Sequence, residues 1–202
     1  MHHLHGVTTT VCSGSSLFTP IVDSYDHQFP NYDDSVTSYT LPFPFPWITG
    51  EGITSIGIST NGAINMPYRS TSYYIGPIAG SVPRIAVAQE DLNPGAGGSI
   101  YAKTAADGNS VTISWENVPF FPNSGFVNAQ VTLHKTGDIT FCYGSGNTAG
   151  NYISAGLSDN AFSLAFPMPL PGFDAQGRSA LFPQNTCACL NNSWTVRTIW
   201  QL

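Results

Sequence analysis

Turn-forming residues recur along this chain at intervals of about eight to twelve residues, the spacing that short strands joined by tight turns require. The chain contains 20 glycines and 15 prolines. Between them lie short runs in which apolar and polar residues alternate, and no segment has a convincing helical pattern. We therefore predict an all-β fold, an antiparallel β-sandwich with extended terminal arms.

Residues 110–118 show the alternation most clearly. One face carries Val111, Ile113 and Trp115, and the other carries Thr112, Ser114 and Glu116. Successive side chains of a strand point to opposite faces of a sheet. The segment is therefore predicted to be a half-buried strand, with its apolar face in the core.

Two further segments are predicted to be β-hairpins. Residues 128–144 alternate on both sides of a turn that contains Gly137, which is free to adopt a positive φ. Residues 53–66 contain the pair Asn61-Gly62, a strong signal for a type I′ turn.

The charge of the chain is low and excludes one class of partner. Only 9% of residues are charged, against roughly 25% in an ordinary soluble domain. Six basic and twelve acidic residues give a net charge of −6, so no basic surface for nucleic acid is expected. No apolar run approaches the roughly 18 residues of a membrane span, and we predict none. The composition favours an extracellular surface or one covered by neighbouring subunits.

Four cysteines, Cys12, Cys142, Cys187 and Cys189, allow two disulfides in three connectivities. A single residue separates Cys187 from Cys189, which does not fit the spacing of a zinc site. We expect Cys142 or Cys12 to bond to the Cys187/Cys189 pair in an extracellular protein. Asn191 begins an N-x-S sequon and is a glycosylation candidate if the source is eukaryotic.

Two acidic segments leave a structural and a metal-binding interpretation open. Glu90 and Asp91 follow a predicted strand, and the carboxylate of Asp91 can accept hydrogen bonds from the amides of the turn at residues 93–98. Asp33 and Asp34 lie in a second acidic loop that also contains Asp23 and Asp26. Carboxylate and carbonyl oxygens are the ligands of calcium, but neither segment has the spacing of an EF-hand. No cofactor is predicted, and calcium is the alternative.

No pattern in the chain indicates catalysis. The G-x-S-x-G, H-E-x-x-H, Walker and dinucleotide-binding motifs are absent from the sequence. His134 lies at the tip of a predicted hairpin, where a solvated turn residue is expected, and a loop hydrogen bond accounts for His27. We therefore expect the protein not to be an enzyme.

Both ends of the chain have β character and little charge. Residues 1–12 and 193–202 carry no acidic residue, and Arg197 is their only Lys or Arg. Charges usually protect exposed strand edges from pairing with other chains. We predict that one arm adds a strand to a neighbouring subunit, the alternative being that it folds back on its own sheet. The candidate assembly residues are Val7, Val11, Trp194, Val196 and Trp200.

Five blocks in the middle of the chain follow one another in a recognisable order: "LPFPFPWITGEGITSIGISTNGAINM", "RIAVAQEDLNPGAGGSIY", "VTISWENVPFF", "NAQVTLHKTGDITFCYG" and "SAGLSDN". Together, across roughly residues 41–160, they resemble the nidogen-like domain, including the versions in plexin-domain-containing membrane proteins and in secreted bacterial surface proteins. The resemblance implies an extracellular β-sandwich used for adhesion or matrix assembly, without a catalytic apparatus. We divide the chain into an arm and acidic aromatic loop (1–40), a nidogen-like core (41–166) and a proline-rich connection with Cys-x-Cys and a C-terminal strand (167–202).

These observations predict an extracellular structural protein that self-associates as a subunit of a surface filament or matrix. One alternative is a monomeric adhesion module that binds glycans or matrix proteins through exposed aromatic residues. The candidates for that surface are Tyr68, Tyr73, Tyr74, Phe120 and Phe121. A second alternative, an accessory domain of a secreted enzyme, rests on analogy alone.

Overall fold

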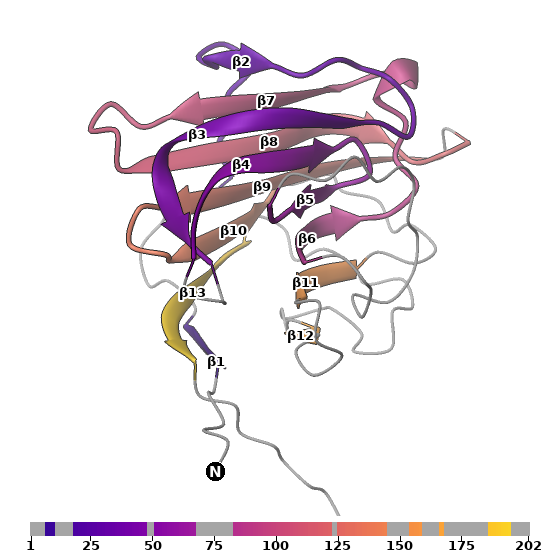
Figure 1. Ribbon diagram of the computed structural model, residues 1–202. Helices are drawn as coiled ribbons and strands as arrows, with labels where there is room; N and C mark the ends of the chain where they lie inside the picture. The colour runs from indigo at the N-terminus through magenta and orange to yellow at the C-terminus, as the bar shows by residue number, and fades with distance from the viewer. Residues whose placement is uncertain are drawn as a thin grey trace, which may run out of the picture.

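Two antiparallel sheets face each other in the computed structural model of this chain (Figure 1). The structure describes residues 7–10, 18–47, 51–67, 83–122, 125–144, 154–158, 166–167 and 186–194. It thereby confirms the predicted all-β sandwich. Within this part of the chain, no helix is long and apolar enough to cross a membrane.

The larger sheet has seven strands in the order β1-β13-β10-β9-β8-β7-β2. Their bounds are β1 (Val7–Thr10), β13 (Thr186–Trp194), β10 (Ile139–Tyr143), β9 (Phe126–His134), β8 (Ser110–Pro119), β7 (Ser99–Thr104) and β2 (His27–Gln28). From β10 to β7 the strands are neighbours in sequence or nearly so, because short turns join antiparallel strands.

The smaller sheet has six strands in the order β12-β11-β6-β5-β4-β3. Their bounds are β12 (Phe166–Pro167), β11 (Ser154–Ser158), β6 (Arg84–Gln89), β5 (Ala63–Asn65), β4 (Gly52–Ser59) and β3 (Val36–Pro46). A short 3-10 turn, η1 (Pro94–Ala96), connects β6 to β7. Strand β3 runs across the division that we placed between residues 40 and 41.

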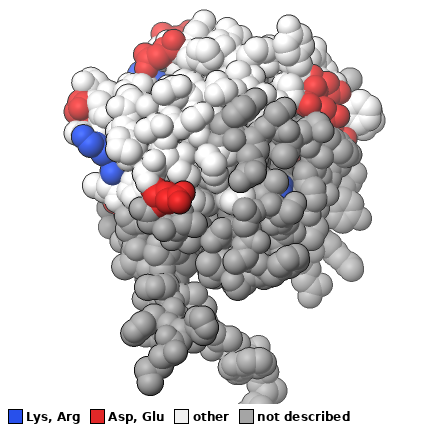
Figure 2. Space-filling view, in the orientation of Figure 1, with Lys and Arg blue, Asp and Glu red and all other residues white. Residues whose placement is uncertain are grey.

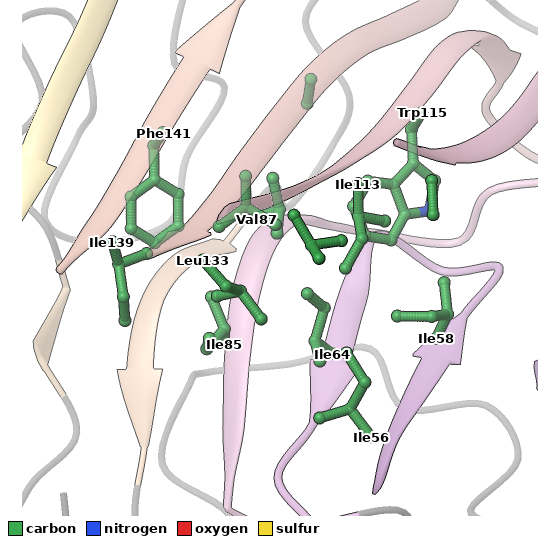
Figure 3. Close-up of a cluster of buried hydrophobic side chains, with 14 of the residues drawn as sticks. Ile56, Ile58, Ile64, Ile85, Val87, Ile113, Trp115, Leu133, Ile139 and Phe141 are labelled. Atoms are coloured by element: carbon green, nitrogen blue, oxygen red, sulfur yellow. The ribbon is translucent and has the colours of Figure 1, made fainter. Parts of the chain in front are cut away.

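The core lies between the inner faces of the two sheets (Figure 3). Val111, Ile113 and Trp115 of β8 are fully buried there, as the alternation predicts. Burial of such side chains stabilises the fold by about 1.5–3 kcal/mol each. Two hydrogen bonds also join the sheets: Trp115 Nε1 donates to the carbonyl of Ser59 at 3.1 Å, and Tyr143 Oη donates to that of Val87 at 2.7 Å.

The structure confirms the predicted turn of one hairpin but not that of the other. Gly137 has a φ of 93° in the β9–β10 turn, as expected. In the β4–β5 turn Gly62 has a φ of 72°, but Asn61 keeps a negative φ. Because a type I′ turn needs positive φ at both central residues, that prediction is wrong. Ser59 instead pairs with Ala63, which leaves a three-residue loop with glycine in the left-handed position.

One side of the sandwich is closed by an aromatic cluster. The ring of His27 contacts Phe29 edge-on, with 4.6 Å between centroids, and both rings lie within 5.8 Å of Tyr39 on β3. Burial raises the pKa of the Tyr39 hydroxyl, which is hydrogen-bonded to the side chain of Thr104. Because β2 and β3 are the edge strands of different sheets, this cluster joins their edges.

The predicted solvated face of β8 is partly buried instead. Ser114 is inaccessible and Glu116 is 5% exposed. Residues 18–21, which we call the N-terminal strap, lie against this face, where the main-chain N–H of Ile21 donates to Glu116 Oε1 at 2.6 Å. The alternation predicted the two faces correctly, but it carries no information on a distant segment that covers the second face.

The first and last described strands, β1 and β13, belong to the seven-stranded sheet. Strand β1 pairs with β13, with Val7 opposite Trp194, and β13 pairs with β10. The C-terminal strand is thus described at residues 186–194, whereas Val11, Val196 and Trp200 lie outside the described residues. In this single chain the arms fold back on their own sheet, and addition to a neighbour stays a prediction.

Candidate functional site

Three carboxylates from two distant segments meet at one edge of the sandwich. Asp33 and Asp34 precede β3, and Asp91 follows β6. One oxygen from each of them lies within 4.8 Å of the others. We call this group the acidic triad. It combines the two acidic segments that the sequence offered as separate metal-binding candidates.

Asn61, in the β4–β5 turn, brings the two segments of the triad together. Its Nδ2 donates to Asp34 Oδ1 at 2.8 Å, and its Oδ1 accepts the main-chain N–H of Leu92 at 2.9 Å. Its carbonyl also accepts the N–H of Glu90 at 3.4 Å. The sequence assigned Asn61 only a turn, so this role was missed.

The carboxylates of the triad repel one another. Desolvation raises the pKa of Asp91, and the negative charges of Asp34 and Asp33 raise it further. A hard cation would offset this repulsion, and calcium takes six to eight oxygen ligands, of which three carboxylates supply a part. Asp33, Asp34 and Asp91 are the residues that could hold such an ion, with carbonyl groups and water completing its coordination.

The sequence suggested that the Asp91 carboxylate accepts hydrogen bonds from the amides of the turn at residues 93–98, and this interpretation does not hold. The amides of Asn93, Ala96 and Gly97 donate to the main-chain carbonyls of Pro119, Asn93 and Pro94, respectively. They therefore do not cap the Asp91 carboxylate. Main-chain acceptors satisfy these donors. Two of the bonds lie within the turn itself, and the local sequence cannot show the third because Pro119 lies in another strand.

The other acidic candidates lie outside the triad. Glu90 is 7% exposed and is not a member of this group of described carboxylates. Asp26 accepts the main-chain N–H of Thr104 at 2.6 Å, so it fastens the loop before β2 to β7. Asp23 is exposed. Of the two acidic segments, therefore, only Asp33, Asp34 and Asp91 converge.

Two exposed aromatic residues are connected to the triad, one by its place in the chain and one by a main-chain hydrogen bond. Tyr32, 69% exposed, directly precedes Asp33, and the N–H of Phe121, which is 53% exposed, donates to the carbonyl of Asp91 at 2.8 Å. Phe120, which the sequence offered as an exposed aromatic, is wrong for that role because it is buried in the core. Tyr68, Tyr73 and Tyr74 lie outside the described residues.

The described surface carries few charges (Figure 2). Acidic side chains occur there in a few separate groups, with large uncharged areas between them. The two histidines discussed above are engaged within the fold: His134 Nε2 lies 3.0 Å from Thr140 Oγ1, and His27 packs in the aromatic cluster. Burial lowers the pKa of His134, although the negative charge of Asp138 partly opposes this shift.

Cys142 lies in β10, and the paired strand β13 contains Cys187, Cys189 and Asn191, whereas Cys12 lies outside the described residues. Cys142 stands opposite Cys187 in the register and is disulfide-bonded. The side chain that bonds to it is outside the described part of the structure, so the connectivity stays a prediction. Asn191 lies within β13, and the structure does not describe its side chain.

Comparison with known families gives one match. A family described as NIDO related matches residues 10–170, which include the triad, Asn61, the whole of the smaller sheet, and β2 and β7 to β10 of the larger one. This chain belongs to that family. The NIDO-related match confirms the resemblance to the nidogen-like domain and supports an extracellular-type domain. Searches of curated proteins and of solved structures gave no match.

Proposed function

We propose that this NIDO-related protein is an extracellular structural subunit that associates with copies of itself into a surface filament or matrix. In this proposal the chain ends provide the contacts and the protein catalyses no reaction. One observation carries the proposal: β1 and β13, the first and last described strands of the chain, are neighbours at one edge of the same sheet (Figure 1).

The position of β1 makes it the natural point of contact. It is the last strand of the seven-stranded sheet, and β13 is its only partner among the described strands. An edge strand offers a row of main-chain donors and acceptors to another chain, and proteins usually protect such edges with charged residues. The sequence of β1, VTTT, contains no charge. Strand addition there would extend the sheet from one subunit into the next.

The low charge of the whole chain supports the same role. With 9% charged residues, close contact between copies requires the desolvation of fewer charged groups than in an ordinary soluble domain. Such a surface is suited to close contact with neighbouring subunits.

The test is to place a charge on the edge strand. Thr8→Lys adds a charge to β1, and Thr8→Gln is the matched control, long and polar but neutral. Sedimentation velocity over a range of concentrations, with electron microscopy of the assembled material, measures the association. We expect wild type and Thr8→Gln to assemble, and Thr8→Lys to assemble less. A wild-type protein that stays monomeric at high concentration would refute the proposal.

A second candidate function is adhesion through the acidic triad. Two of the four large apolar or aromatic side chains described as exposed, those of Tyr32 and Phe121, favour it. Tyr32 directly precedes Asp33 in the chain, and the main-chain N–H of Phe121 donates to the carbonyl of Asp91. Aromatic rings and cation-bound carboxylates together suit glycans or matrix proteins. Binding of the monomer to glycan arrays with calcium and with chelator tests this candidate, and loss of binding in Tyr32→Ala and Phe121→Ala variants would locate the surface.

A further inference from the structure

The N-terminal strap, residues 18–21, is held by a polar network on the outer face of the seven-stranded sheet. Glu116 Oε1 accepts the N–H of Ile21 at 2.6 Å, and Gln130 Nε2 donates to the carbonyl of Thr19 at 2.7 Å. Both bonds reach main-chain atoms of the strap. Ser114 joins the two gripping residues, since its Oγ donates to Glu116 at 2.7 Å and accepts from Gln130 at 3.0 Å. We call Ser114, Glu116 and Gln130 the strap slot.

The slot is specific for an extended segment that does not pair as a strand. Pro20 stands between the two gripped residues and has no N–H, so this position cannot donate to a ladder of main-chain bonds. Side chains of β8 and β9 instead form the hydrogen bonds to the main chain of the strap. The side chain of Ile21 is buried, whereas Thr19 and Pro20 remain exposed. Phe18 packs over Gly144, where an added Cβ would lie 2.9 Å from its ring.

An exposed turn separates the strap from the rest of the sandwich. Residues 22–24 are exposed, and the N–H of Ser24 donates to the carbonyl of Ile21 at 2.9 Å, which closes the turn. Beyond it, Asp26 and Phe29 are fastened to β7 through their main-chain N–H groups. If this turn extends, the strap leaves its own slot and β1 leaves its pairing with its own β13, while the other strands of the sandwich keep theirs.

We propose that the strap exchanges between two copies of this chain, each strap occupying the slot of the other. A second copy is the fitting occupant because it offers the same Ile21 N–H, the same Thr19 carbonyl and the same Phe18 ring. The exchanged strap therefore forms every bond that it forms within one chain, whereas the turn at residues 22–24 extends and β1 leaves its own β13. This inference rests on the proposed self-association and names the residues that would hold the arm of a neighbour.

Two defective chains test the exchange when they are mixed. Ile21→Pro removes the strap's donor but leaves its slot intact, and Glu116→Ala removes the slot's acceptor but leaves its strap intact. Neither chain can form the Ile21–Glu116 bond by itself or with its own copies. A pair that exchanges straps restores one such bond, between the Glu116→Ala strap and the Ile21→Pro slot.

Native mass spectrometry with one chain isotope-labelled distinguishes mixed from like pairs. We expect mixed dimers to be favoured roughly 10- to 100-fold over either like pair, the factor that one hydrogen bond to a charged group contributes. The matched control mixes each single variant with the Ile21→Pro/Glu116→Ala double variant, which restores no bond. Mixed dimers no more abundant than in this control would overturn the proposal.

A second comparison does not disturb the slot, so it holds even if Glu116→Ala folds poorly. Ser24→Pro removes the N–H that closes the turn, whereas Ser24→Ala keeps that N–H and loses only the hydroxyl that accepts from Lys103 Nζ at 2.8 Å. We expect a several-fold larger dimer fraction for Ser24→Pro in sedimentation velocity. Equal dimer fractions would count against exchange.

The results also separate this inference from the proposed function. Wild-type assembly that depends on Thr8 but is unchanged by Ser24→Pro, without preferential mixed dimers, keeps the proposed function and removes strap exchange. If the two variants form mixed dimers but the wild type never assembles beyond a dimer, strap exchange is kept and the filament is refuted.

Discussion

Glu116 is predicted to be a main determinant of how firmly the N-terminal strap is held. Replacing it with alanine removes the acceptor of two buried hydrogen bonds, from the Ile21 N–H at 2.6 Å and the Ser114 hydroxyl at 2.7 Å. A hydrogen bond to a charged group contributes about 1.5–3 kcal/mol. Burial of the Glu116 carboxylate, which is 5% exposed, costs free energy, and the alanine variant avoids this cost. This gain offsets part of the loss.

The expected net effect is a loss of about 2–4 kcal/mol in the free energy of unfolding, since the Ile21 amide is left without its acceptor in a buried position. For a chain of this size that corresponds to a fall in Tm of roughly 4–16 °C. Glu116→Gln keeps an acceptor oxygen at the same position. It is therefore expected to lose only about 1 kcal/mol.

Chemical denaturation of the wild type and the two variants measures these differences, provided that the slope of unfolding free energy with denaturant is unchanged. Amide exchange of Ile21 measures the strap directly, because opening of the strap exposes this N–H without global unfolding. We expect its protection to fall in Glu116→Ala while that of β8 and β9 is retained. A loss below about 0.5 kcal/mol, or equal losses for both variants, would refute the reasoning.

Three further predictions concern the triad, a turn and the contact between sheets. Because the folded state raises the pKa of Asp91, this residue stabilises the fold when protonated, and this contribution is lost as pH rises from about 4 through that pKa. Asp91→Asn should therefore be more stable than wild type at neutral pH, and a calcium-dependent rise in Tm seen only in wild type would identify the triad as an ion site. Gly62→Ala should cost roughly 3 kcal/mol or more in denaturant unfolding, since its Cβ would overlap a main-chain carbonyl, whereas Gly108→Ala, also at positive φ but with open space around it, should cost only about 1 kcal/mol. Tyr143→Phe removes the 2.7 Å bond to the facing sheet and should cost about 1–2 kcal/mol by the same measurement, and an unchanged stability would show that this bond contributes nothing.

The sequence by itself determined the fold class and the core face of its strands. Period-two alternation is a property of neighbouring residues, so Val111, Ile113 and Trp115 could be assigned to the core without knowing what packs against them. Local turn chemistry likewise predicted the position of Gly137. The order of the five sequence blocks was enough to indicate the family.

Only the tertiary structure decided which segments meet. Asp34 and Asp91 belong to one site because Asn61, from a third segment, bonds to Asp34 and to the main chain of Leu92, the residue after Asp91. No local pattern records a contact between residues so far apart. Glu116 reads as a solvent-facing strand residue because the strap that covers it lies 95 positions earlier in the chain. Alternation tells which face of a strand is apolar, whereas the burial of its polar face depends on long-range contacts that the chain forms only when it folds.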